Sequence, residues 1–326
     1  MKAAAVPLIP GSDGPLKSLA DAKIVAAKVG YPVMIKAVAG GGGKGIRLVD
    51  DESQLADSYA QAQLEAAGAF GNDQLYLEKI MLDVKHIEVQ IFRDRFGNAV
   101  YFPERDCSMQ RFKQKVIEET PSALLTPVER AELGAIALKA AEQINYENTG
   151  TVEFLMDQDH QFYFLEMNTR IQVEHPVTEM VTGVDLVREQ ILVAAGAPLS
   201  FDQAAVETRG FALECRLNAE DPDNNFAPSA GTVNYLYLPT GNLGVRIDTH
   251  LFSGYAISPF YDAMIGKLIT WGATREIAIA KMHRVLNELI VSGIKTNAQF
   301  QQTLLEDPVF LSSQATTDYL TSLATD

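Results

Sequence analysis

The sequence predicts an α+β protein made of two parts. Segments with helical spacing of apolar residues alternate irregularly with short strands rich in β-branched residues, which is typical of that fold class. The chain has 326 residues, of which 47% are hydrophobic, so a large buried core is expected. A change of composition at Gly196–Glu207 predicts a soft boundary near residue 205, between residues 1–205 and 206–326, which need not fold independently.

The strongest local signal is a helix start at residue 126. Thr126 and Glu129 form a capping-box pattern and Pro127 takes the first helical position, so a helix is expected to about Ile144. Other helices are predicted at Ser18–Gly30, which glycine closes, and at Asp51–Ala67, Thr178–Ala195 and Thr274–Ile290. Strands are predicted at Pro32–Val38, Leu75–Ile80, His86–Asp94, Ala99–Arg105, Phe211–Asn218, Thr232–Leu238 and Val245–Leu251.

Composition and charge exclude several classes of function. The formal net charge of −15 argues against a nucleic-acid-binding protein, although a local basic pocket for phosphates stays compatible with it. Cys107 and Cys215 lie far apart and show no zinc or disulfide spacing, which favours a reducing cytoplasm. No apolar run approaches the ~20 residues of a membrane span, and no signal-peptide pattern opens the chain. A cytoplasmic protein without a membrane partner is therefore expected.

A run of glycines lies between two predicted strands. Four successive glycines lose much backbone entropy on ordering, and close approach of backbone N–H groups to an anion such as a triphosphate would explain them. A strand follows the run, so neither P-loop nor dinucleotide-binding spacing fits. The pattern predicts a lid over phosphates, with charge from two lysines; a plain flexible hairpin is the alternative. The predicted phosphate-binding residues are Lys36, Gly41, Gly42, Gly43 and Lys44.

A predicted hairpin of residues 151–157 and 162–168 carries facing carboxylates. Its expected register places Glu153 opposite Glu166, where like charges are destabilising unless a cation lies between them. Asn168 follows Glu166 by two residues and so shares its face. These oxygen ligands suit Mg²⁺ or Mn²⁺ held also by substrate phosphates. Two solvated glutamates on an exposed face are the alternative, and a one-residue slip of register would remove the pairing.

Polar residues continue at every second position after this hairpin. An extended segment would present them as a single row, ending where His175-Pro176 stops the run. Arginine and glutamine can hold a small oxyanion such as bicarbonate, and a neighbouring carboxylate can act as a general base. An ordinary amphipathic strand with a solvated face is the alternative. The row consists of Glu166, Asn168, Arg170, Gln172 and Glu174.

Four segments carry distinctive motifs: Glu104–Arg111 (ERDCSMQR), the glycine run, Glu166–Glu179 (EMNTRIQVEHPVTE) and Glu214–Asp221 (ECRLNAED). Together they resemble biotin carboxylases and related biotin-dependent carboxylases over nearly the whole chain. The resemblance implies an ATP-grasp domain in residues 1–205, with a glycine-rich lid at about 30–80. A biotin carboxylase C-terminal domain is implied for residues 206–326.

The resemblance also implies roles for single residues. ATP would be bound by Lys36, Glu78, Lys79, the backbone of Met81, His86, Gln110 and Lys113, and metals by Glu153, Glu166 and Asn168. Bicarbonate would be held by Arg170, Gln172 and the backbone of Val173, with Glu174 as its base. Lys115 would neutralise phosphate charge, and Arg216 would stabilise the enolate of biotin.

The implied reaction is the ATP-dependent carboxylation of biotin by bicarbonate, through carboxyphosphate. It is the first half-reaction of enzymes such as acetyl-CoA carboxylase, which serves fatty acid biosynthesis. The implied cofactors are ATP with Mg²⁺ or Mn²⁺, and biotin is the carrier-bound substrate. The implied partners are a biotin carboxyl carrier protein, a carboxyltransferase and a second copy of the chain in a homodimer.

The chain departs from the family pattern in three ways. Lys113 stands where many relatives have histidine, and Lys44 where an arginine is common, and both keep positive charge. A further α/β domain is expected ahead of the segment that begins at Met1, so a truncated chain is inferred. A catalytically silent nucleotide-binding fragment is one alternative, and another ATP-grasp ligase such as carbamoyl-phosphate synthase is the second.

Overall fold

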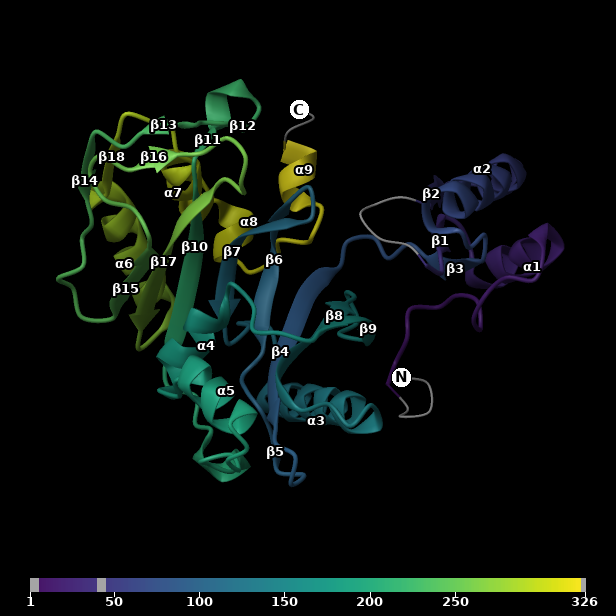
Figure 1. Cartoon of the computed structure of the whole chain (residues 1–326), viewed down its shortest axis with the longest axis horizontal. Coiled ribbons are helices and arrows are strands. Elements are labelled where there is room, and N and C mark those ends of the chain that lie inside the picture. Colours follow the sequence, from purple (N-terminus) through teal and green to yellow (C-terminus); the bar gives the residue numbers. More distant parts are fainter. Residues whose placement is uncertain (1–5, 40–44, 324–326) are drawn as a thin grey trace. The chain divides into compact units, whose positions relative to one another are not determined.

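The chain forms two compact units in the computed structural model, which describes residues 6–39 and 45–323 (Figure 1). The smaller unit is Pro7–Leu82, and the larger comprises Asp83–Asp326 with Met1–Val6. The smaller unit contains the predicted lid range, about 30–80. No described helix is both long enough and apolar enough to cross a membrane.

The smaller unit is a three-stranded antiparallel sheet covered by two helices. Its strands run in the order β2 (Ile46–Val49), β1 (Val33–Ala37) and β3 (Leu75–Lys79). α1 (Leu19–Val29) and α2 (Glu52–Phe70) bury small and aliphatic side chains against the strands, giving the unit a core of its own. Because β1 and β2 pair directly, the predicted strand–loop–strand arrangement is confirmed, while residues 40–44 at its tip lie outside the described residues.

Capping explains where the predicted helices begin. Ser18 accepts a hydrogen bond from the Asp21 N–H at the start of α1, which ends before Gly30 as predicted. α3 (Pro127–Gln143) has the complete capping box between Thr126 and Glu129. Both helices therefore begin at the residue that the sequence indicates.

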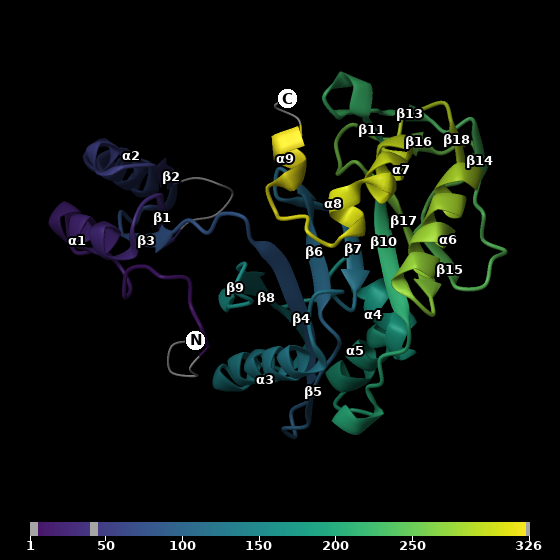
Figure 2. The same ribbon diagram turned by 180° about the vertical axis from the view of Figure 1, so that it is seen from behind.

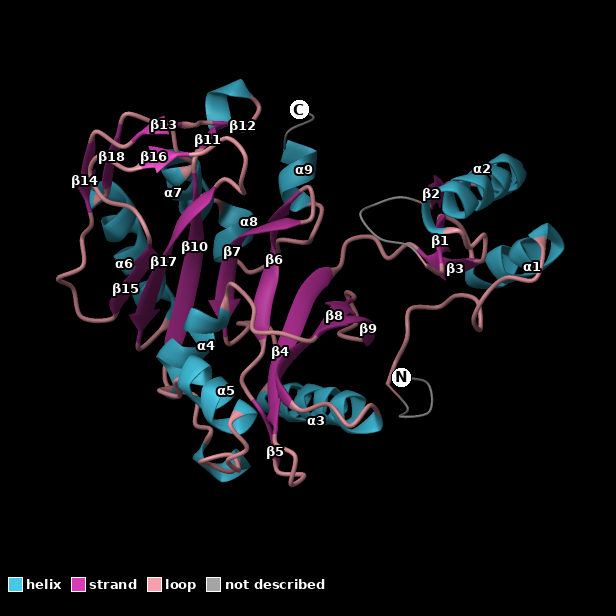
Figure 3. Ribbon diagram, viewed as in Figure 1, coloured by secondary structure: helices cyan, strands magenta, loops and turns pink. Residues whose placement is uncertain are grey.

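The larger unit is built on an antiparallel sheet of nine strands that differ in length (Figure 3). Its strand order is β15-β17-β10-β7-β6-β4-β8-β9, with β5 paired to β4. The bounds are β4 Lys85–Arg93, β5 Ala99–Tyr101, β6 Arg105–Arg111, β7 Gln114–Thr120, β8 Asn148–Met156, β9 Phe162–Asn168, β10 Phe211–Asn218, β15 Val245–Thr249 and β17 Met264–Gly272.

This sheet continues across the predicted boundary at residue 205. β7, which precedes the boundary, pairs with β10, which follows it, through residues such as Ile117 and Cys215. The nine-stranded sheet therefore contains strands from both sides of residue 205, in agreement with the expectation that the two parts need not fold independently. The division at 205 stays a prediction about domains, while the compact units divide near residue 82.

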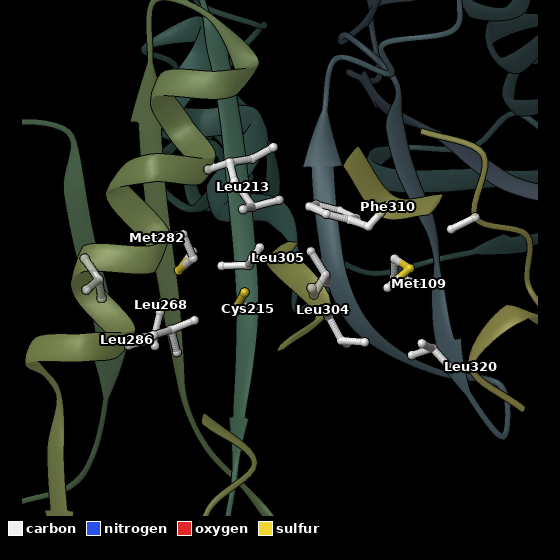
Figure 4. Packing of buried hydrophobic residues seen from close by; sticks show 14 residues of the cluster. Met109, Leu213, Cys215, Leu268, Met282, Leu286, Leu304, Leu305, Phe310 and Leu320 are labelled. Carbon is white, nitrogen blue, oxygen red and sulfur yellow. The ribbon is translucent and has the colours of Figure 1, made fainter. Parts of the chain in front are cut away.

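Helices cover both faces of the sheet. α4 (His175–Thr182) packs on β10 and β17 through Val177 and Val181, and α5 (Leu186–Ala194) follows it (Figure 1). The view from behind shows α6 (Arg275–Glu288) and α7 (Ala298–Glu306) on the opposite face (Figure 2). α8 (Pro308–Leu311) and α9 (Tyr319–Leu323) complete that layer. The largest core lies beneath α6 to α9, where Leu213, Leu268 and Met282 are buried with their neighbours (Figure 4).

Short paired segments complete the C-terminal part. They are β11 (Glu220–Asp221), β12 (Ala227–Pro228), β13 (Gly231–Thr232), β14 (Tyr235–Tyr237), β16 (Ala256–Ile257) and β18 (Ile290–Ser292). The single strand predicted at Thr232–Leu238 is therefore wrong, because its residues divide between β13 and β14.

Two other predicted elements also differ from the structure. The helix predicted at Thr178–Ala195 is two helices, because Gly183 adopts a left-handed conformation (φ 73°) that ends α4. The strand predicted at Ala99–Arg105 ends at Tyr101, and Arg105 begins β6 instead. β6 and β7 were missed because they bury polar and charged residues, which hides the apolar pattern on which strand prediction depends.

Candidate active site

A polar pocket of about 500 Å³ opens on the larger unit. Side chains from β4, β7, β8, β9, β10 and the segment before α4 meet there. It brings together most of the site residues predicted in this unit. The lining residues are His86, Lys113, Gln114, Lys115, Glu153, Glu166, Asn168, Arg170, Gln172, Val173, Glu174, Arg216, Asn218, Glu220, Asp262, Ala263 and Met264.

Glu153 and Glu166 lie directly opposite each other on β8 and β9, as predicted. The register that produces the pair differs from the expected one, because Phe162 pairs with Met156 and not with Asp157. Leu165 of β9 is an extra residue opposite the step from Glu153 to Phe154, and this bulge shifts the pairing by one residue and restores the facing carboxylates. A regular hairpin with this loop would have placed Glu153 opposite a leucine.

Polar groups converge on the Glu153 carboxylate. Its Oε1 accepts hydrogen bonds from Asn168 Nδ2 (2.9 Å), Gln172 Nε2 (2.7 Å) and Lys115 Nζ (3.3 Å). Asn168 Nδ2 also lies 3.3 Å from Glu166 Oε1, so its amide bridges the two carboxylates. The two facing carboxylates provide the hard oxygen donors that a divalent cation such as Mg²⁺ prefers, while Asn168 Oδ1 accepts from Arg170 and would have to turn toward the ion to join them. The residues present therefore fit a metal held between β8 and β9.

Lys115 links three carboxylates at the base of the pocket. Its Nζ donates to Glu88 Oε2 and Glu174 Oε1, both at 2.6 Å, and more weakly to Glu153. Burial favours the neutral amine, but the surrounding carboxylates outweigh burial and hold the pKa of Lys115 above its ordinary value. The ammonium group therefore stays charged and can meet a phosphate or carboxylate that enters the pocket.

Glu174 lies between two cations, with only 1% of its surface exposed. Its Oε1 accepts from Lys115, and its Oε2 accepts from Arg216 Nη2 at 2.9 Å. Arg216 also donates through Nε to Glu118 Oε1 at 2.6 Å. The backbone carbonyl of Arg216 accepts from Asn297, just ahead of α7, so the strand that carries this arginine is anchored on both sides.

The predicted polar row is wrong beyond Asn168, where β9 ends. Arg170, Gln172 and Glu174 follow in turns and irregular backbone, yet they line the same pocket. Gln172 is fixed by hydrogen bonds at both ends of its amide, because Nε2 donates to Glu153 and Oε1 accepts from Arg105 Nη2 at 2.9 Å. Side-chain hydrogen bonds therefore bring these groups together in the pocket. The alternation of an extended strand was expected to do this.

Arg105 is the central organiser that sequence reasoning missed. Its guanidinium is fully buried and donates to Glu88, Gln90, Thr151, Gln172 and Thr178. Burial raises the energy of a carboxylate at Glu88, but Lys115 and Arg105 more than offset it and hold the pKa of Glu88 well below its usual range. The available signal was the charged motif Glu104–Arg111 itself, since so many ionisable residues in one strand need buried partners.

His86 and Gln110, both predicted to contact ATP, lie side by side. Gln110 Nε2 is 2.9 Å from His86 Nδ1, while His86 Nε2 faces Glu153 Oε2 at 3.2 Å. Burial disfavours the imidazolium, but Glu153 and Glu88 outweigh burial and raise the pKa of His86 to about 9. Gln110 does not line the pocket itself and acts on it through His86.

The remaining predicted ATP contacts lie in the smaller unit. Lys36 forms an ion pair with Glu78 across β1 and β3. Lys79 Nζ donates to the carbonyls of Gly30 (3.0 Å) and Tyr31 (2.8 Å), so it caps the C-terminal end of α1. Met81 follows β3 at the end of this unit. Gly41, Gly42, Gly43 and Lys44 lie outside the described residues.

Further lining residues had no role in the sequence analysis. Asp262, Ala263 and Met264 line the pocket at the start of β17, and Glu118 on β7, which does not line it, holds Arg216. Their positions depend on strand neighbours that are distant in the chain. No local pattern in the sequence indicates them.

Comparison with known proteins identifies the family of this chain. Residues 1–201 match the family of the carbamoyl-phosphate synthase L chain, ATP binding domain, and residues 214–322 match the biotin carboxylase C-terminal domain. Biotin carboxylase 1 of Bacillus subtilis is 51% identical over 321 residues, covering 98% of this chain and 71% of that protein. The 2-oxoglutarate carboxylase small subunit of Hydrogenobacter thermophilus is 48% identical, with 98% and 68% covered.

Solved structures give the same result. A biotin carboxylase–β,γ-ATP complex from Campylobacter jejuni has a TM-score of 0.92 at 46% identity, covering 98% of this chain and 71% of that one. The biotin carboxylase domain dimer of the Hydrogenobacter thermophilus 2-oxoglutarate carboxylase, in complex with MgADP, ADP and bicarbonate, has a TM-score of 0.90 at 47% identity. It covers 98% of this chain and 71% of that one.

The fold and the pocket define an ATP-grasp ligase with an appended C-terminal domain. With relatives about half identical over nearly its whole length, the chain belongs to the biotin carboxylase family.

Proposed function

We propose that this chain carries out the ATP-dependent carboxylation of biotin with bicarbonate, and that the pocket around Lys115 is where the reaction occurs. One observation carries the proposal. Facing carboxylates, an arginine beside a glutamine, a buried carboxylate and two cations held by carboxylates converge in a single pocket. The match of residues 214–322 to the biotin carboxylase C-terminal domain favours biotin over carbamoyl-phosphate chemistry.

Phosphoryl transfer would take place beside the Glu153–Glu166 pair. These carboxylates and Asn168 would hold a divalent cation, Mg²⁺ or Mn²⁺, which when bound neutralises charge on the triphosphate. Lys115 would supply a fixed positive charge for the transferred phosphoryl group and the carboxyphosphate that results. Lys36, Glu78, Lys79, Met81, His86, Gln110 and Lys113 stay predicted ATP contacts, as do the residues of the glycine run.

Bicarbonate would bind where Arg170, Gln172 and the backbone of Val173 border the pocket. The amide of Gln172 is already oriented by Arg105 and Glu153, so little ordering is left to be done when the anion binds. Glu174 would accept the bicarbonate proton as the oxygen attacks the γ-phosphate. Its contacts with Lys115 and Arg216 hold it at the reacting centre.

Biotin would bind beside Arg216. Carboxyphosphate gives CO₂ and phosphate, the phosphate removes the proton from the ureido nitrogen, and the nitrogen attacks CO₂. The guanidinium would stabilise the negative charge that develops on the ureido oxygen in this step. Because Glu118 and Glu174 hold Arg216 from two sides, that charge meets an arginine that is already in place.

The physiological setting follows from the same chemistry. We propose a biotin carboxyl carrier protein as the source of biotin, a carboxyltransferase as the consumer of carboxybiotin, and a homodimer in the cytoplasm. Acetyl-CoA carboxylase of fatty acid biosynthesis is the proposed whole enzyme. Some relatives belong to other carboxylases, such as the 2-oxoglutarate carboxylase small subunit. The final carboxyl acceptor would therefore be selected by the carboxyltransferase and not by this chain.

Phosphate release from MgATP tests the function directly. The chain should release phosphate from MgATP only when bicarbonate is present, biotin should accelerate this release, and calorimetry should detect binding of MgATP. Binding of MgATP without release of phosphate would contradict the proposal and identify a catalytically silent nucleotide-binding chain. Release that depends on bicarbonate but ignores biotin would point to a different ATP-grasp ligase.

A further inference from the structure

Two glutamates face each other beneath Arg216. Glu118 on β7 and Glu214 on β10 are paired residues of adjacent antiparallel strands. Side chains at such positions extend to the same face of the sheet, with Cβ atoms about 4.5–5.5 Å apart. Both side chains are completely buried.

The pair has too few donors for two carboxylates. Glu118 Oε1 accepts from Arg216, but Glu118 Oε2 and both oxygens of Glu214 accept no hydrogen bond from any residue that the structure describes. Buried carboxylate oxygens almost always have partners, because an ionised oxygen without one is strongly destabilised. A proton on one carboxyl would turn it into a donor for the other, remove the repulsion and give a partner to two of the three unpaired oxygens.

The charged groups around the pair do not neutralise two negative charges. Arg216 on the same strand as Glu214 is shared between Glu118 and Glu174, and Lys115 is taken by Glu88, Glu153 and Glu174. Lys267 on β17 donates to the carbonyl of Val173 and lies 3.6 Å from Asp248 Oδ2. The cations that face the pair are therefore already engaged by other acceptors.

We propose that Glu118 and Glu214 share a single proton, and that this half-neutral carboxyl pair positions Arg216 in the pocket. The proton lies mainly on Glu214, whose hydroxyl donates to the free oxygen of Glu118. Glu118 keeps its charge for Arg216. Burial, with the neighbouring charge of Glu118, raises the pKa of Glu214 well above its usual range, and burial raises the pKa of Glu118 to about 7.

This arrangement makes the position of Arg216 depend on pH. While the proton is present, Arg216 has one charged partner at Glu118 and one at Glu174. When the proton leaves, a second buried negative charge appears beside Arg216 and competes with Glu174 for the guanidinium. Glu118 and Glu214 are thus positioning residues, and the inference rests on the role proposed above for Arg216.

Infrared spectroscopy and thermal unfolding test the shared proton. Wild-type protein at neutral pH should show the carbonyl band of a protonated carboxylic acid, and Glu214→Gln should lack it. The folded pair keeps a proton that the unfolded carboxyls release, so the melting temperature of the wild type should fall as pH rises above neutral. Glutamine carries no such proton, so the fall should be smaller in Glu214→Gln.

The pH profile of biotin-dependent turnover tests the positioning role. The alkaline limb of kcat should move to higher pH in Glu214→Gln. Glu118→Gln, which removes the charged partner of Arg216, should lower kcat for biotin more than tenfold while leaving the KM for ATP unchanged. Glu207→Gln, at an exposed side chain, is the control and should alter none of these measurements.

Specific outcomes would overturn the proposal. The absence of a carboxylic acid band in the wild type, or identical pH dependence of melting in wild type and Glu214→Gln, would exclude a shared proton. A Glu214→Gln chain that cannot fold would also contradict it, because glutamine has the shape of protonated glutamic acid. Isotope-labelled wild-type protein provides the infrared test without any variant. If Arg216 plays no part in biotin chemistry, the turnover profiles stay unchanged while the infrared and melting results still report the proton.

Discussion

At the scale of single residues, the pocket is organised by a few cations that each hold several acids. Lys115 contacts three carboxylates, and Arg105 makes hydrogen bonds to five side chains. Such groups are costly to bury unless every donor is used, and here they fix the orientation of the residues that would meet substrate. Preorganised charge of this kind is the main contribution a protein makes to phosphoryl transfer.

The first residue-scale prediction concerns the metal. Glu166→Gln should lower Mg²⁺-dependent turnover more than tenfold, which corresponds to about 1.4 kcal/mol or more of lost transition-state stabilisation. The amide cannot replace a charged oxygen ligand. Initial rates at increasing Mg²⁺ concentration measure the effect. A Mg²⁺ dependence identical to that of the wild type would reject Glu166 as a ligand.

A second prediction concerns the base. Glu174→Gln should keep its affinity for MgATP and lose bicarbonate-dependent turnover by about a hundredfold or more, since the amide cannot accept the proton. Calorimetry and phosphate release separate the two effects. Glu179→Gln, the same change at a residue of α4 that contacts Arg246, is the matched control. Equal turnover in Glu174→Gln and wild type would remove Glu174 from this role.

At the scale of secondary structure, strand register and helix ends decide where the chemistry lies. The bulge at Leu165 in β9 brings Glu153 opposite Glu166, and Gly183 ends α4 ahead of α5. β6 and β7 carry charged side chains inward, and every such side chain must find a partner on a neighbouring strand. The ends and the register of these elements therefore determine the positions of the site residues as well as the packing of the core.

The capping box of α3 gives the prediction at this scale. Hydrogen bonds from Thr126 lower the pKa of Glu129 to about 2. A depressed folded pKa stabilises the protein above the unfolded pKa and is lost as pH falls toward 2. Thr126→Ala should therefore cost about 1 kcal/mol of unfolding free energy at neutral pH, and less as Glu129 is protonated. Denaturant unfolding at neutral and acidic pH measures it; a pH-independent difference would contradict it.

At the scale of the whole molecule, the chain has two compact units with separate cores. Residues 7–82 contain a sheet, two helices and a buried cluster that do not depend on the nine-stranded sheet. The larger unit is different, because β7 and β10 join its two family domains in one sheet. Domains defined by sequence families and units defined by contacts therefore divide this chain at different residues.

Isolated fragments test this division. Residues 7–82 alone should unfold cooperatively on heating and give dispersed amide resonances, because the fragment keeps its complete core. Residues 206–326, cut at the predicted domain boundary, should aggregate, since β10 would lose β7 and expose an unpaired edge. Circular dichroism and nuclear magnetic resonance measure both. A soluble, cooperatively folded 206–326 fragment would show that the boundary near 205 also separates folding units.

Local chemistry allowed the sequence by itself to determine the helix caps, the β1–β2 hairpin and the family, whereas the pairing of Glu153 with Glu166 also needed a bulge. Those features depend on residues a few positions apart or on short sequence motifs. Only the tertiary structure decided that β7 pairs with β10, that Arg105 holds the pocket together and that Glu214 faces Glu118. These contacts join residues separated by tens of positions or more. Their partners are chosen by strand order and bulges, which no local pattern encodes.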